Sequence, residues 1–258
     1  MKEFFGFGGY QRQPEGYFSW QHLTFVTSLM VLMVTLAWVL GRKNRSCPYP
    51  VKNRVLVWAA FLMDGCELFK IIVMCVRAED PMNWLYNLPL FLCSIQLIAI
   101  PMAAFCKGRL REASLDFVFI FGILGAVLGT YFAGQNYAAY PVLSLDNVVS
   151  GITHSISGFC SLYIGISGMI SMKKENMPTC FGVLLGFCAV AYVVNHLADY
   201  NYMFLMAGDG TPYDILYNLL GGNPVLYPMG VVALFVVYIS LFYGVYFLLT
   251  RKKATAEC

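Results

Sequence analysis

The chain has 258 residues, of which 59% are hydrophobic and 12% are charged, and its mean hydropathy is +0.65. A soluble domain carries about 25% charged residues, so this composition excludes the soluble classes. The sequence indicates an integral membrane protein.

Seven apolar stretches are each long enough to cross a hydrocarbon layer about 30 Å thick, which takes roughly 20 helical residues. They lie near residues 21–40, 55–76, 88–105, 115–132, 148–171, 179–205 and 224–250. We therefore predict an all-α, polytopic bundle of seven transmembrane helices that forms a single membrane domain over residues 1–258. The first twenty residues are aromatic and glycine-rich, and no small-residue cleavage site follows the first span, so we expect this span to remain as an anchor.

The basic residues indicate the orientation of this bundle. Most of the 17 Lys and Arg residues lie in the loops that follow odd-numbered spans. The opposite loops contain Glu79, Asp80, Asp146, Asp209 and Asp214. The positive-inside rule then predicts an N-terminus outside and a cytoplasmic C-terminus. The net charge of +3 follows from this topology and gives no indication of nucleic-acid binding.

The nine cysteines contain no C-x-x-C pair, and there are only three histidines. This pattern resembles neither a secreted disulfide framework nor a zinc site, so we expect no metal and no diffusible cofactor. Cys75 and Cys93 both fall towards the outer side, and a bridge between them stays open as an alternative.

Polar residues gather in the outer half of several expected spans. At about 1.5 Å per helical residue, Cys93 and His154 lie roughly 8 and 9 Å inside the outer ends of their spans. The same half contains Glu67 and Lys70 and, on the sixth span, Asn195, His196, Asp199, Asn201 and Tyr202. An ionisable group in lipid costs about 2.5 to 3.5 kcal/mol and usually faces the bundle interior or a wet cavity. We therefore expect a polar cavity open to the outer leaflet.

Each of these residues also has a purely structural interpretation. Glu67 and Lys70, three residues apart, form a neutralising pair in that case. His196, Asp199 and Asn201 then cap the end of the sixth span and tie it to the following loop. Cys93 is then a packing residue. The functional interpretation is that a thiol with a histidine base is the minimal pair for acyl transfer through a thioester.

Three segments, LPLFLCSI, ITHSISGF and NYMFLMAGDGTPYDILYNLLGGNPVLYP, follow one another in this order. In this combination the chain resembles the YwaF-like family of bacterial integral membrane proteins. Vertebrate relatives of that family are described as cysteine-dependent acyltransferases that act on ether lysophospholipids. The resemblance implies that Cys93 is the nucleophile and His154 its base, and it implies a bacterial plasma membrane location.

The residues and the resemblance together predict an acyltransferase that moves a fatty acyl chain between phospholipids. In this mechanism Pro89 occupies the first turn of the third span, and Gln96, one turn deeper than Cys93, donates to the developing oxyanion. Asn195 and Asn201 are candidates for holding the headgroup or orienting His154. Further candidates for orienting the substrate are His196, Asp199 and Tyr202. The expected partners are phospholipids and lysophospholipids, with no obligate protein partner.

Three alternatives stay open at this point. A lipid hydrolase of the same mechanism would transfer the acyl chain to water. A transporter would use Asp64, Glu67, Lys70 and Asp199 as a substrate or proton path, but the polar groups do not continue to the cytoplasmic side. A receptor is compatible with seven helices by fold analogy alone.

Overall fold

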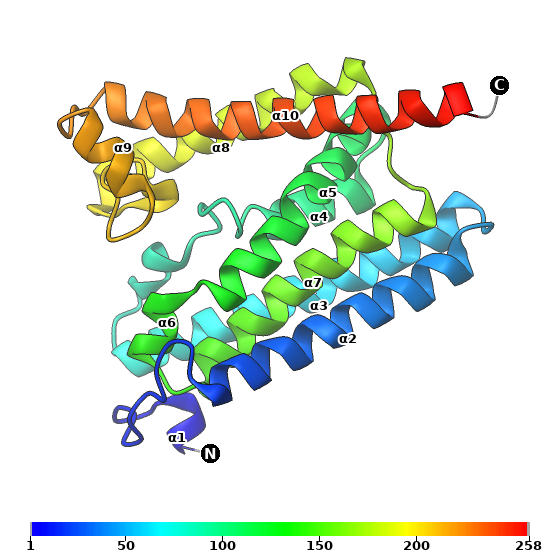
Figure 1. Ribbon diagram of the computed structural model, residues 1–258. Helices are drawn as coiled ribbons and strands as arrows, with labels where there is room; N and C mark the ends of the chain where they lie inside the picture. Colours follow the sequence, from blue (N-terminus) through cyan, green and yellow to red (C-terminus); the bar gives the residue numbers. More distant parts are fainter. Residues whose placement is uncertain (1, 257–258) are drawn as a thin grey trace. The chain divides into compact units, whose positions relative to one another are not determined.

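The computed structural model describes the backbone of residues 2–256 and the side chains as far as residue 250. The described residues form helices and contain no strand (Figure 1). The α-helices are α1 (Lys2–Phe5), α2 (Trp20–Asn44), α3 (Tyr49–Ala78), α4 (Gln96–Phe105), α5 (Gly108–Tyr131), α6 (Gly134–Ala139), α7 (Leu145–Ser167), α8 (Met177–Ala198), α9 (Tyr213–Leu219) and α10 (Leu226–Ala256). Three short 3-10 helices join them: η1 (Asn83–Asn87), η2 (Lys174–Asn176) and η3 (Tyr202–Phe204).

The chain divides into two compact units, the first ending at Ser171 and the second beginning at Met172. In the first unit α7 is the central helix, because it packs against α2, α3 and α5, while α4 contacts α3 and α5 (Figure 1). In the second unit α8 contacts η3 and α10, and α9 contacts α10.

Local sequence sets the limits of α7. Ser144 precedes the helix, and its hydroxyl accepts a hydrogen bond from the Asn147 N–H, as an N-cap serine does. Gly168 ends the helix in the left-handed region, at a φ of 73°, which glycine adopts without steric cost. The helix therefore has a fixed start and a fixed end, and its side chains have a defined register.

Five helical segments of the described chain are long and apolar enough to cross a membrane: Trp20–Asn44, Gly108–Ala139, Leu145–Ser167, Lys174–Ala198 and Leu226–Thr250. The second predicted span is helical throughout, inside the 30-residue α3, but the charged residues Asp64, Glu67 and Lys70 lie within it and set it apart from those five. The prediction of seven spans is therefore only partly confirmed.

The prediction of a continuous helix over residues 88–105 is wrong. The helix there is α4, which begins only at Gln96 and has ten residues. Leu88 is extended, with a ψ of 149°, because a residue that precedes a proline is pushed out of the α region. Pro89 consequently lies in a bend before the helix and does not occupy a first helical turn. Two other predicted ends also move, since α7 stops at Ser167 and α8 at Ala198.

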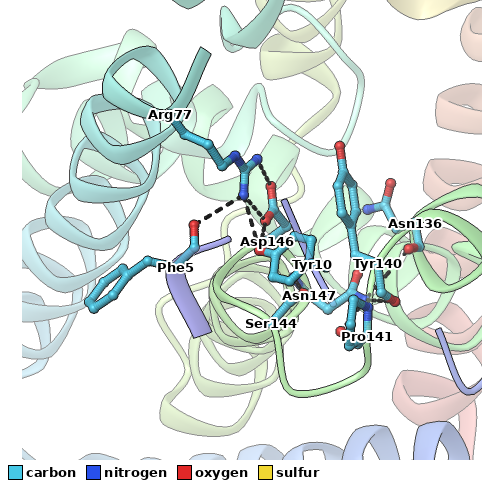
Figure 2. A network of polar contacts seen from close by, with 9 residues as sticks. All are labelled: Phe5, Tyr10, Arg77, Asn136, Tyr140, Pro141, Ser144, Asp146 and Asn147. Atoms are coloured by element: carbon cyan, nitrogen blue, oxygen red, sulfur yellow. Dashed lines mark hydrogen bonds and ion pairs between the residues drawn. The ribbon is translucent and has the colours of Figure 1, made fainter. Parts of the chain in front are cut away.

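A polar network ties the N-terminal segment to α3 and α7 (Figure 2). Arg77 of α3 binds both carboxylate oxygens of Asp146 at the start of α7, at 2.7 and 2.8 Å. The Tyr10 hydroxyl donates to Asp146 at 2.5 Å, and Arg77 also donates to the Phe5 carbonyl at 3.3 Å. Burial and the hydrogen bond to Asp146 raise the pKa of Tyr10, so its phenol stays protonated and keeps donating.

Removing the charge of Asp146 should destabilise the first unit. In Asp146→Asn the guanidinium of Arg77 loses its counter-ion while it stays mostly buried, and such a loss costs about 3 to 5 kcal/mol. We expect a lower Tm in detergent, measured by thermal unfolding. Tyr10→Phe is the matched control, because it keeps the ion pair and removes only the hydrogen bonds that the Tyr10 hydroxyl donates to Asp146 and accepts from Arg77, each worth about 1 kcal/mol. Equal Tm losses in the two variants would contradict the ion-pair role.

Candidate functional site in the first unit

Cys93 lies on the turn that leads into α4. The Ile95 N–H donates to the Phe91 carbonyl at 3.0 Å, and the Gln96 N–H donates to the Cys93 carbonyl at 3.4 Å, so the turn passes directly into the helix. The side chain of Cys93 packs against Gly125 of α5, where an added Cβ would lie 3.5 Å from the Cys93 Cβ. Cys93 is half-buried.

His154, on α7, is held in one tautomer by its own helix. Its Nδ1 lies 2.7 Å from the Ser150 carbonyl oxygen. A carbonyl only accepts, so Nδ1 carries the hydrogen and Nε2 of the neutral ring is the acceptor. The Cys93 thiol and the His154 ring are hydrogen-bond partners. The structure therefore brings the predicted nucleophile and the predicted base together.

Gly129 of α5 allows the imidazole to reach this position. A Cβ built on Gly129 would overlap Cδ2 and Nε2 of His154. Gly125 and Gly129 are one helical turn apart, so they lie on one face of α5, with Cys93 against one glycine and His154 against the other. Sequence reasoning missed both residues, although the repeated glycines of the segment GILGAVLG were a visible signal of close helix approach.

Gln96 is the first residue of α4 and is 0% exposed. Neither its Nε2 nor its Oε1 has a hydrogen-bond partner among the described residues. A buried polar group without a partner costs about 1 to 3 kcal/mol, so such groups usually have a function. The amide of Gln96, three residues after Cys93, has a donor and an acceptor that the fold does not use.

The predicted ion pair between Glu67 and Lys70 is present on α3, with an N–O distance of 2.6 Å. The two side chains are only 15% and 14% exposed. The Lys70 ammonium also interacts electrostatically with His154, so the pair lies close to the site.

The polar residues predicted on the sixth span lie in the second unit, and two of them bind backbone atoms. The Asn195 amide accepts from the Tyr202 N–H at 2.6 Å and donates to the Tyr202 carbonyl at 3.0 Å. Asn201 accepts from the Met206 N–H and donates to the Ala207 carbonyl, both at 2.8 Å. These contacts fasten the loop after α8, and those of Asn201 agree with the structural interpretation of that residue.

The other three residues predicted on the sixth span are placed differently from one another. Asp199 is an exposed left-handed residue at the end of α8. His196 is exposed, and its ring packs edge-on against Tyr192. Tyr202 is buried in the loop that Asn195 holds. Roles of these side chains towards a substrate stay predictions.

In the first unit, Cys75 and Cys93 are both free thiols.

An all-helical chain with several helices long and apolar enough to cross a membrane is a multi-pass membrane protein. Residues 17–246 match the TMEM164 family, and the chain belongs to this family. The matched range covers most of each unit and every residue of the site described above. No curated protein and no solved structure matches the chain.

Gly129→Ala should separate His154 from Cys93. The added methyl group overlaps the imidazole, which must move, whereas alanine itself favours a helix by about 1 kcal/mol over glycine. Without the imidazole a smaller fraction of Cys93 is thiolate, so we expect alkylation of Cys93 by iodoacetamide at neutral pH to slow by roughly tenfold. Peptide mass spectrometry measures this rate. Gly65→Ala is the control, because nothing lies within 4 Å of a Cβ there. An unchanged rate in Gly129→Ala would contradict the pairing.

Proposed function

We propose that the protein is a membrane-embedded acyltransferase that moves a fatty acyl chain between phospholipids through a thioester on Cys93. The observation that carries the proposal is the contact between the Cys93 thiol and the His154 ring. The resemblance to the YwaF-like family, with its cysteine-dependent vertebrate relatives, agrees with this chemistry and adds the bacterial plasma membrane as the expected location.

In the first half-reaction, Nε2 of His154 takes the thiol proton and the sulfur attacks the ester carbonyl of a phospholipid. The C–S bond forms, the ester C–O bond breaks, and the imidazolium returns the proton to the departing glycerol oxygen, which leaves a lysophospholipid. The amide Nε2 of Gln96 is our candidate donor to the oxyanion that develops during the attack.

In the second half-reaction the thioester on Cys93 is the acyl donor and a lysophospholipid is the acceptor. The hydroxyl of an incoming lysophospholipid gives its proton to His154 and attacks the thioester, so that a C–O bond forms and the C–S bond breaks. If water attacks in place of the lysophospholipid, the same site acts as a lipid hydrolase. Adding a lysophospholipid distinguishes the two, because only a transferase then makes a new diacyl lipid.

Mass spectrometry of the purified protein with mixed phospholipids should find an acyl adduct on Cys93. Cys93→Ala should abolish both the adduct and acyl exchange. Cys106→Ala removes a thiol just after the end of α4 and should leave both the adduct and acyl exchange intact. A Cys93→Ala protein that exchanges acyl chains at the parental rate would remove the nucleophile assignment.

His154→Gln should slow acyl exchange by roughly 10² to 10⁴, the usual contribution of a positioned acid–base group. Part of this loss should be recovered as the pH rises, since a thiol with an ordinary pKa of about 8.5 then ionises unaided. The measurement is the rate of exchange against pH for the parent and the variant. A variant with the parental rate at neutral pH would exclude His154 as the base.

Lipid entry from the outer leaflet depends on the predicted orientation. Single cysteines at Asp209 and at Lys173, both exposed, test it in a background without other reactive thiols. We expect an impermeant maleimide to label position 209 in sealed cells and position 173 only after permeabilisation. The reverse pattern would place entry on the cytoplasmic leaflet.

A further inference from the structure

One face of α3 lies against α7. Val73 forms a buried cluster with Leu145 and Val149, Cys66 packs against the same cluster, and Arg77 binds Asp146. Residues spaced by three or four positions share a helix face, and 66, 70, 73 and 77 follow that spacing. Lys70 therefore belongs to the face of α3 that contacts α7.

The two helices run antiparallel. Lys52, near the start of α3, donates to the Ser167 carbonyl at the end of α7, whereas Arg77 meets Asp146 at the opposite ends. Lys70 lies roughly 10 Å along α3 from Arg77, and His154 lies roughly 12 Å along α7 from Asp146, at 1.5 Å per residue. This register brings Lys70 level with His154, which agrees with the electrostatic interaction between the two side chains.

The ammonium of Lys70 has donor capacity beyond its ion pair. An ammonium has three donors, and Glu67 accepts from Lys70 at 2.6 Å. The other cation on this face, Arg77, is engaged by both oxygens of Asp146. A mostly buried cation in a membrane helix is costly, and such residues commonly mark the path of a substrate.

We propose that Lys70 binds the phosphodiester of the lipid whose ester carbonyl is presented to Cys93 and His154. This inference rests on the proposed function and adds the residue that holds the phosphate of the substrate. In a glycerophospholipid only glycerol carbons separate the ester oxygen from the phosphate oxygen, so an ester at Cys93 brings the anion close to the site. Lys70 supplies a point charge that suits a phosphate, and Glu67 holds this charge when no lipid is bound.

The test measures lipid binding without turnover. In Cys93→Ser protein, purified in a maltoside detergent, we compare a short-chain phosphatidylcholine with the diacylglycerol of the same acyl chains. Two further variants isolate the charge: Glu67→Gln, which keeps Lys70, and Glu67→Gln/Lys70→Gln, which leaves no unpaired charge. The double variant should bind phosphatidylcholine roughly 10- to 100-fold more weakly than the single one, the range for a charge-assisted hydrogen bond. Binding of diacylglycerol should be unchanged.

Three results would overturn the inference. Equal phosphatidylcholine affinity in the two variants would mean that Lys70 only neutralises Glu67. A parallel loss for both lipids would indicate a packing role. Inorganic phosphate that binds as tightly as the lipid, with the same dependence on Lys70, would indicate a site for free phosphate. A missing acyl adduct on Cys93 would instead reject the proposed function, and the binding result stands independently of it.

Discussion

The ion pair between Arg77 and Asp146 sets the register on which the rest of the first unit depends. A two-point contact between guanidinium and carboxylate has one good geometry, so α3 cannot slide along α7 without breaking it. A buried ion pair gains stability only when further hydrogen bonds satisfy its atoms, and Tyr10 and the Phe5 carbonyl supply them. The N-terminal segment thereby helps to fix the position of Lys70 along α3 relative to His154 on α7.

A second constraint comes from α5, which contributes shape and no reactive group. Helices in lipid associate through close packing, and glycines allow the closest approach. Gly125 and Gly129 leave space for the side chains of Cys93 and His154, so the distance between thiol and imidazole depends on two missing methyl groups. Substitutions at these glycines should therefore change the proposed chemistry without altering Cys93 or His154 themselves.

Composition and apolar runs were sufficient to predict an all-helical membrane protein, but they did not predict the start of α4. The segment from Leu88 to Ile100 is apolar almost throughout, and hydropathy cannot distinguish an apolar turn from an apolar helix. Pro89 was the local signal, since it forces Leu88 out of the helical region. Cys93 lies in a turn, to which the helical rise of about 1.5 Å per residue does not apply. Cys93 nevertheless lies against His154 because of the path of this turn. No periodic pattern in the sequence predicts that path.

The amide side chains show why the remaining site residues could not be separated by sequence. Asn195, Asn201 and Gln96 carry the same functional group, and each lies within an apolar run or at its end. Only their partners differ: backbone atoms of a loop engage both asparagines, whereas the buried amide of Gln96 has none among the described residues. Hydrogen-bond capacity that is used in folding is no longer available for catalysis. Gln96 is thus the amide most suited to the proposed reaction, and it lies in the same unit as Cys93, His154 and Lys70.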